Sequence, residues 1–285
     1  MSLDGDKPRH DANRVYQSGK GSFDEIIENV AAIEHRQYVG CAVTITKEPF
    51  PLVTTLDELG KYFMTISVKP VRSEALGLDE EGLARWVSEY EQLERRLESD
   101  VQKGDIALLF RLLNGDDYFG KFILRSFLNV KALSRCDASC GRIAVAVDGS
   151  FYPCPALMRQ EYQIGSVDRG FCCSKASAYY ERQVKRTSCV NCCFRFACGG
   201  ECMAESDAPN PIMCRFKQSL ILLAMLLEEN CRRFNNDVYK QIIDFCLEKK
   251  NRNRENVSLR EFRLLYPQLT FTEAKCKFDQ ERPAY

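Results

Sequence analysis

Histidine is scarce in this sequence. Only two of the 285 residues are histidines, His10 and His35, against 15 cysteines. Mixed sites such as Cys2His2 zinc sites need imidazole ligands, so a metal site built from this chain has to be almost purely thiolate. All-sulfur ligation selects zinc or iron–sulfur clusters. Neither histidine stands in a catalytic pattern, and we expect a solvated or capping role for both.

An excess of one charge is also missing, because 40 Lys and Arg residues balance 40 Asp and Glu residues. Nucleic-acid surfaces carry surplus Lys and Arg to displace counterions, so no nucleic-acid partner is expected. The longest apolar run, Leu220 to Leu227, is too short to cross a bilayer. The first residues lack the apolar core of a signal peptide. We therefore expect no membrane partner and a cytoplasmic location.

A cytoplasmic location determines how the cysteines are interpreted. A reducing compartment keeps thiols free, so clustered cysteines favour metal binding or redox chemistry over a disulfide framework. A hydrophobic fraction of 45% over 285 residues is enough for one large domain or two ordinary ones. The composition therefore excludes disorder as the main state.

Helix and strand patterns alternate in the first hundred residues, which predicts βαβ units on a parallel sheet. Functional side chains are then expected at the carboxyl ends of the strands. The predicted elements are a helix over 23–35 opened by a capping box at Ser22, a strand over 38–46, a short helix opened by a capping box at Thr55, a strand over 64–68 stopped by Pro70, and a long amphipathic helix over 83–101.

The character of the chain changes near residue 104, and four segments are expected: 1–103, a helical bridge over 104–134, a cysteine-rich module over 135–216 and a helical tail over 217–285. Residues 136 to 214 hold eleven of the fifteen cysteines. The turn Asp148-Gly149 between apolar runs predicts a hairpin in this module. A small loop-rich module of this kind needs bound metal or other cross-links to be stable.

The strongest motif is Cys189-x2-Cys192-x5-Cys198-x3-Cys202, followed by Cys214. Upstream stand Cys136, Cys140 and Cys154, so eight candidate ligands fill two four-ligand sites. Two structural zinc sites and two iron–sulfur clusters share this thiolate chemistry. Gaps of five and three residues are less typical of zinc ribbons and favour iron–sulfur ligation. The remaining cysteines are expected to be packing residues: Cys41, Cys172, Cys173, Cys193, Cys231, Cys246 and Cys276.

These residues resemble the SPASM domain, the auxiliary-cluster module of radical S-adenosylmethionine (SAM) enzymes that modify peptides and proteins. The resemblance rests on Cys136, the Gly149-x4-Cys154 step, the central four-cysteine run and Cys214. It implies two interleaved [4Fe-4S] auxiliary clusters. The first would be held by Cys136, Cys140, Cys154 and Cys202, and the second by Cys189, Cys192, Cys198 and Cys214.

The N-terminal part looks like the second half of the radical SAM barrel. The segment Ser2-Leu3-Asp4-Gly5, the His10-Asp11 pair and Arg14 resemble the region after the fourth barrel strand, and 43–46 and 68–71 resemble strands five and six. By this resemblance Ser2 and Arg14 contact the methionyl group of SAM. The implied fold class is α/β, a partial (half) radical SAM TIM-type barrel followed by a SPASM domain and a helical tail.

One motif of that family is missing. The C-x3-C-x2-C that ligates the SAM-cleaving cluster occurs nowhere in these 285 residues. The chain is therefore expected to be unable to cleave SAM alone, and SAM is expected as a cofactor only of a complete enzyme. A fragment, a truncated gene product and one subunit of a split enzyme all fit, and a missing N-terminal radical SAM half is a possible partner.

The surrounding sequence looks most like peptide maturases that install thioether or related cross-links, including the quinohemoprotein amine dehydrogenase maturation type. Anaerobic sulfatase maturases are the alternative, but they carry an Asp directly after the Gly-x4-Cys, where this chain has Pro155. A peptide or protein substrate follows from either. A different class of function is a non-catalytic, zinc-filled module that binds a peptide or protein.

Overall fold

The computed structural model describes residues 1–34, 39–71, 75–115, 117–185, 187–204, 210–234 and 236–248. The chain forms two compact units, and the first joins Met1–Val130 to Asn210–Leu247. The second is built around residues 131–204. Helices from the expected bridge and from the expected tail both belong to the first unit. His35, Tyr38, Cys276 and the rest of the expected tail, 249–285, lie outside the described residues.

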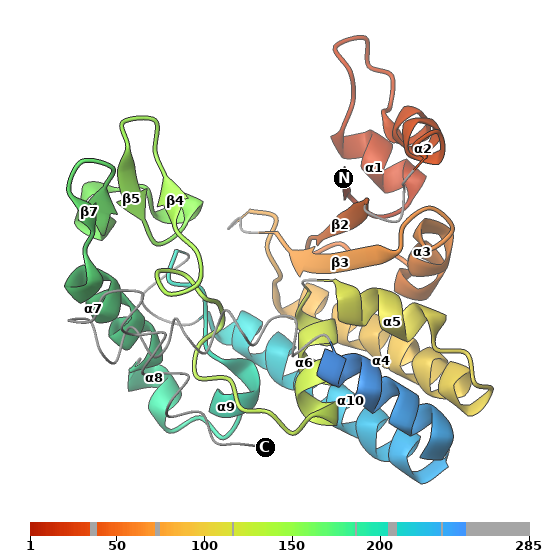
Figure 1. Ribbon diagram of the computed structural model, residues 1–285. Coiled ribbons are helices and arrows are strands. Elements are labelled where there is room, and N and C mark those ends of the chain that lie inside the picture. Colours follow the sequence, from red (N-terminus) through yellow and green to blue (C-terminus); the bar gives the residue numbers. More distant parts are fainter. Residues whose placement is uncertain are drawn as a thin grey trace. The chain divides into compact units, whose positions relative to one another are not determined.

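The first unit is a mixed α/β structure (Figure 1). Its elements are β1 (Ser2–Leu3), α1 (Lys7–Asn13), α2 (Phe23–Ala31), β2 (Gly40–Ile45), α3 (Leu52–Leu59), β3 (Thr65–Pro70), α4 (Glu80–Gln102), α5 (Ala107–Asn114), α6 (Tyr118–Phe127) and α10 (Pro211–Phe234), with further helix over 236–248.

The sheet of the first unit has the order β1-β2-β3. Both pairings are parallel, with Leu3 opposite Val43 and Val43 opposite Val68. The predicted parallel sheet is therefore confirmed. The predicted strand over 64–68 is confirmed as β3, which runs two residues further and ends at Pro70, paired with Ile45. Proline lacks only its own N–H, which an edge strand of the described sheet does not need at that position.

Neither of the two helices predicted to start with a capping box, α2 and α3, has that cap in the structure. Ser22 makes no side-chain cap for α2, and its hydroxyl donates to the carbonyl of Arg14. The helix predicted from Thr55 begins earlier, at Leu52, directly after Pro51. A carboxylate oxygen of Glu89, on α4, accepts the N–H of Leu52 at 2.8 Å. A side chain distant in sequence thus caps α3 instead of a local one.

The core of the first unit centres on α4. Asp79 caps α4 by accepting the N–H of Gly82, and the helix buries Trp86 and Tyr90. The Tyr90 ring packs edge-on against Phe119 of α6 and Phe216 of α10, with centroids 5.4 and 5.6 Å apart. Helix α10 packs along both α4 and α6 (Figure 1). No helix among the described residues is long and apolar enough to cross a bilayer.

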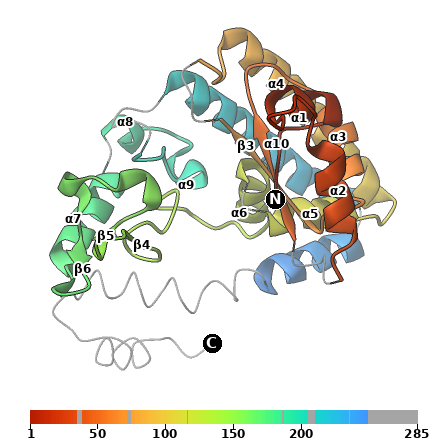
Figure 2. The same ribbon diagram turned by 90° about the horizontal axis from the view of Figure 1, so that it is seen from above.

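The second unit is small and irregular. Its short strands form one antiparallel sheet and lie beside α7 (Figure 2). The predicted hairpin is confirmed, since Val145 pairs with Phe151 and Gly149 turns with φ of 78°. The elements are β4 (Ala144–Val145), β5 (Ser150–Tyr152), the 3-10 helices η2 (Pro155–Leu157) and η3 (Gln160–Tyr162), β6 (Gly165–Ser166), β7 (Gly170–Phe171), α7 (Cys173–Val184), α8 (Thr187–Val190) and α9 (Arg195–Cys198).

Candidate functional site

The two residues predicted to contact SAM are hydrogen-bonded to each other beside β1. Nη2 of Arg14 donates to the Ser2 hydroxyl at 3.0 Å. The same guanidinium donates to both carboxylate oxygens of Asp4, at 2.8 and 3.1 Å. The Arg14 side chain is 43% exposed. The structure thus brings Ser2 and Arg14 together beside one carboxylate, with part of the guanidinium open to a ligand.

His10 is buried, so the expected solvated or capping role is wrong for this residue. Its Nδ1 accepts the N–H of Asp4 at 3.3 Å, and its Nε2 lies 2.9 Å from the Ser22 hydroxyl. Burial lowers its pKa. The ring links the end of β1 to the start of α2, which keeps the Ser2 and Arg14 segment in place.

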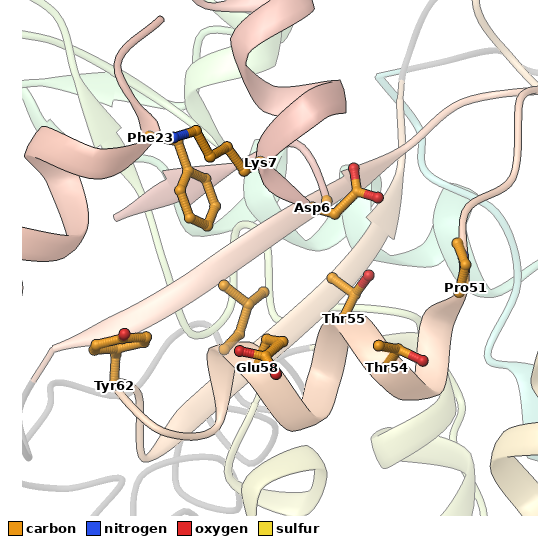
Figure 3. A pocket seen from close by; sticks show the side chains of 10 residues that line it. Asp6, Lys7, Phe23, Pro51, Thr54, Thr55, Glu58 and Tyr62 are labelled. Carbon is orange, nitrogen blue, oxygen red and sulfur yellow. The ribbon is translucent and has the colours of Figure 1, made fainter.

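A cavity of about 240 Å³ lies next to this segment, between the loop after β1 and α3 (Figure 3). Its wall combines the rings of Phe23 and Tyr62 and the side chain of Leu59 with the carboxylates of Asp6 and Glu58. The wall contains neither Ser2, Arg14 nor any cysteine. The cavity is therefore separate from both predicted sites.

Two cysteines of the predicted first quartet, Cys136 and Cys202, lie within electrostatic range of a third, Cys154. Burial is the main cause that raises the pKa of Cys154, and the thiols of Cys202 and Cys136 raise it further. The same three thiols raise the pKa of Tyr179, for which burial is again the main cause. Tyr179 packs in a small core with Leu157 and Met203, and Cys154 lies against that core.

Hydrogen-bond donors surround these sulfur atoms. Backbone N–H groups of Ala156 and Leu157 donate to the Cys154 sulfur and act to lower its pKa. Nε2 of the buried Gln183 donates to Sγ of Cys136 at 3.7 Å. N–H donors of this kind stabilise and tune metal-bound thiolates. Cys140 sits in a tight turn, and its thiol donates to the Ala138 carbonyl at 3.8 Å.

The cysteines of the predicted second quartet come from both units. Cys189 lies on α8 and Cys198 ends α9, while the N–H of Cys192 donates to the Cys189 carbonyl at 3.2 Å. The Cys198 thiol donates to the Gly200 carbonyl at 3.7 Å. Cys214 lies on α10, in the first unit.

Within the part of the chain that the structure describes, no three cysteine, histidine or acidic side chains stand close enough to hold a metal ion. The convergence of the two quartets therefore stays a prediction. The donor set around Cys154 nevertheless fits an iron–sulfur cluster, because it offers only sulfur ligands, neighbouring thiols and N–H donors. Thiolates converge fully when metal binding is coupled to folding.

The remaining cysteines divide into two kinds. Cys41, Cys231 and Cys246 are buried, as expected for packing residues, and burial raises the pKa of Cys41 to about 12. Cys193 is exposed, so the packing role expected for it is wrong. The Ser174 hydroxyl lowers the pKa of Cys172, which is partly exposed.

The sequence analysis missed two residues that lie next to the predicted cluster cysteines. Tyr179 and Gln183 belong to no recognisable motif, yet both face the first group of cysteines. The only available signal was the helical spacing of Ala176, Tyr179 and Gln183, which form the buried face of α7.

Comparisons with known proteins give a likeness in structure. No family model matches the sequence, and no curated protein matches it either. Native anSMEcpe with bound AdoMet, a solved structure of an anaerobic sulfatase-maturating enzyme, is 16% identical and has a TM-score of 0.57. The match covers 82% of this chain and 68% of that chain.

A second solved structure, native anSMEcpe with bound AdoMet and the Kp18Cys peptide, is 16% identical with a TM-score of 0.55. That match covers 81% of this chain and 68% of that chain. At this level of identity a likeness carries information on the fold. The chain therefore shares its mixed α/β fold with these radical SAM and SPASM structures over most of its length.

Proposed function

We propose that this chain is the auxiliary-cluster-bearing part of a radical SAM maturase that modifies a peptide or protein. The observation that carries the proposal is the group of Cys136, Cys154 and Cys202, which all lie within electrostatic range of Tyr179 in a chain with this fold. In the proposal Cys140 completes this quartet. Cys189, Cys192, Cys198 and Cys214 form the other.

The peptide substrate is proposed by analogy with the neighbouring structures. Native anSMEcpe has been solved with a Kp18Cys peptide and with a Cp18Cys peptide, each together with AdoMet. We propose that the complete enzyme containing this chain likewise acts on a peptide segment, and that it forms a thioether or related cross-link.

A sulfatase maturase is the second candidate, favoured by the fold of anSMEcpe. One local feature argues against it. Pro155 follows Cys154 and begins the 3-10 helix η2, where the resemblance places a catalytic Asp in sulfatase maturases. No carboxylate is available at that position to take a proton from the substrate.

For SAM, the proposed contacts are Ser2 and Arg14. A guanidinium holds a carboxylate through two parallel N–H donors, and the partly exposed Arg14 suits the methionyl carboxylate. Asp4 orients Arg14 by accepting two of its hydrogen bonds. A bound iron–sulfur cluster would supply single-electron transfer in this fold. The residues of this chain hold and orient the ligands around it.

Radical generation needs a segment that is not among these residues, because the sequence has no C-x3-C-x2-C. We propose that such a segment extends the sheet at β1, which is the edge strand next to β2 in the described sheet. An edge strand has backbone groups on its outer side that can pair with further strands.

Anaerobic purification followed by metal analysis and a visible spectrum tests the proposal. The expected result is about eight irons per chain and a broad absorption near about 400 nm, as two [4Fe-4S] clusters require. A colourless protein with about two zincs would instead identify the zinc-filled binding module.

The reconstituted chain should form no 5′-deoxyadenosine from SAM and reductant. Product formation by this chain alone would refute the proposed dependence on a further radical-generating segment.

A further inference from the structure

An ion pair with one buried partner stands directly next to two of the predicted cluster cysteines. Arg135 precedes Cys136 and Glu201 precedes Cys202. Nη1 of Arg135 lies 3.0 Å from Oε1 of Glu201, and the Glu201 side chain is 1% exposed. The pair therefore joins two cysteine-bearing segments that are 66 residues apart in sequence.

The Glu201 carboxylate also holds its own segment. The same atom, Oε1, accepts the N–H of Cys202 at 3.2 Å. One oxygen thus fixes the Cys202 backbone on one side and the Arg135 guanidinium on the other. Rotation of the Cys202 segment away from Cys136 would break the contact between Glu201 and Arg135.

The backbones of the two segments also approach closely. The N–H of Ala132 donates to the Phe196 carbonyl at 2.7 Å. Gly199 has φ of 75°, and a Cβ built there would lie 2.7 Å from the carbonyl oxygen of Ser134. Only glycine fits such a position. The segments 132–136 and 196–202 therefore lie against each other, with the ion pair at the cysteine end.

A buried ion pair is a weak source of stability, because desolvation of the charges offsets their attraction. Its best-attested use is to specify one arrangement over others. We propose that Arg135 and Glu201 are a positioning pair that sets Cys136 beside Cys202 so that both can bind one cluster. This inference rests on the proposed function, since it assigns a role toward the first cluster.

The variant Glu201→Gln tests the pair, because the amide oxygen still accepts the Cys202 N–H while the charge is lost. Iron content should fall from about eight to about four per chain, with the spectroscopic signal of only one [4Fe-4S] cluster left. The control Glu181→Gln removes an exposed glutamate that pairs with Lys185 in the same unit, and it should keep both clusters. Retention of both clusters in Glu201→Gln would overturn the proposal.

A second measurement separates this inference from the proposed function. In the metal-free chain, a short thiol-bridging reagent and peptide mapping give the ratio of Cys136–Cys202 to Cys136–Cys154 cross-links. Glu201→Gln should lower that ratio several-fold, whether the native metal is iron or zinc. An unchanged ratio would refute the positioning role, whereas zinc in the wild-type protein would refute only the proposed function.

Insoluble Glu201→Gln protein would be replaced by the double variant Arg135→Met with Glu201→Leu, which leaves no unpaired buried charge. A folded double variant that loses the first cluster and the cross-link preference supports the pair. One that keeps both refutes it.

Discussion

Glu94 illustrates how one buried residue links stability to pH. This α4 residue is 3% exposed, and its Oε1 has no hydrogen-bond partner. Burial, with a smaller contribution from the neighbouring Glu98, raises its pKa from 4.5 to about 7. Glu94 also lies within electrostatic range of Cys231 on α10. The carboxyl therefore holds its proton more tightly in the folded chain than in the unfolded chain.

The sign of the pH effect follows from that difference. The stabilising contribution of the proton is fully present below pH 4.5 and is lost as the pH rises through about 7. We expect Glu94→Gln to raise the free energy of unfolding by about 1–3 kcal/mol at pH 8. The gain should shrink toward zero near pH 4.5.

Urea unfolding of the variant and the wild type at both pH values measures this effect. Glu91→Gln, a partly exposed glutamate on the same helix, is the control and should show no such pH dependence. An equal gain for Glu94→Gln at both pH values would contradict the assignment of a raised pKa.

At the scale of single elements, α3 shows how a helix start is set from outside. Its N-cap residue, Pro51, offers no side-chain hydrogen bond. Glu89 of α4 accepts the Leu52 N–H instead. The carboxylate thus pairs one of the N–H groups that have no partner within the helix. Its negative charge also interacts favourably with the positive end of the helix dipole.

Removal of that cap should destabilise the first unit. We expect Glu89→Ala to lower the free energy of unfolding by about 1 kcal/mol. Chemical denaturation measures it against Glu91→Ala, which has similar exposure on the same helix. Equal losses for the two variants would show that Glu89 contributes only helix propensity.

At the scale of the whole molecule, the two units differ in what stabilises them. The first has a large core around Trp86, which is the only tryptophan in the chain. The second has a small buried core of Ala138, Leu157, Tyr179 and Met203. Small cores usually need staples such as metal sites, so metal removal should affect the units unequally.

We expect removal of the proposed clusters to accelerate proteolysis within residues 131–204 by about tenfold or more, because the binding of metal by thiolates is in general coupled to folding. The urea midpoint of Trp86 fluorescence should change much less, since Trp86 lies in the core of the first unit. Collapse of the Trp86 midpoint on metal removal would show that the two units fold as one.

The elements of this protein could largely be predicted from sequence, because their signals are local. Helical periodicity predicted α4, and the β-branched run from Val43 predicted β2. The Asp148-Gly149 turn predicted the hairpin, as the pairing of Val145 with Phe151 confirms. Each of these signals comes from residues that are close together in the sequence. The hydrophobic pattern sets the helix or strand, and the turn residues set the hairpin.

The candidate site could be predicted only in part. Sequence resemblance named Ser2 and Arg14, but only the tertiary structure shows them bonded beside Asp4. The local patterns placed a cap at Ser22 and a solvated role at His10, whereas the two side chains contact each other. The Ser22 hydroxyl therefore meets a buried imidazole from another segment and makes no cap for α2.

The amino-acid sequence by itself therefore determined the alternation of strands and helices, the spacing of the cysteines and the nearly pure thiolate character of any metal site. The tertiary structure decided which polar groups meet, such as Arg135 with Glu201 and Gln183 with Cys136. The reason is physical. Backbone preferences act between neighbours in the chain, whereas a buried charge or amide takes whatever partner the packing of distant segments brings within hydrogen-bonding distance.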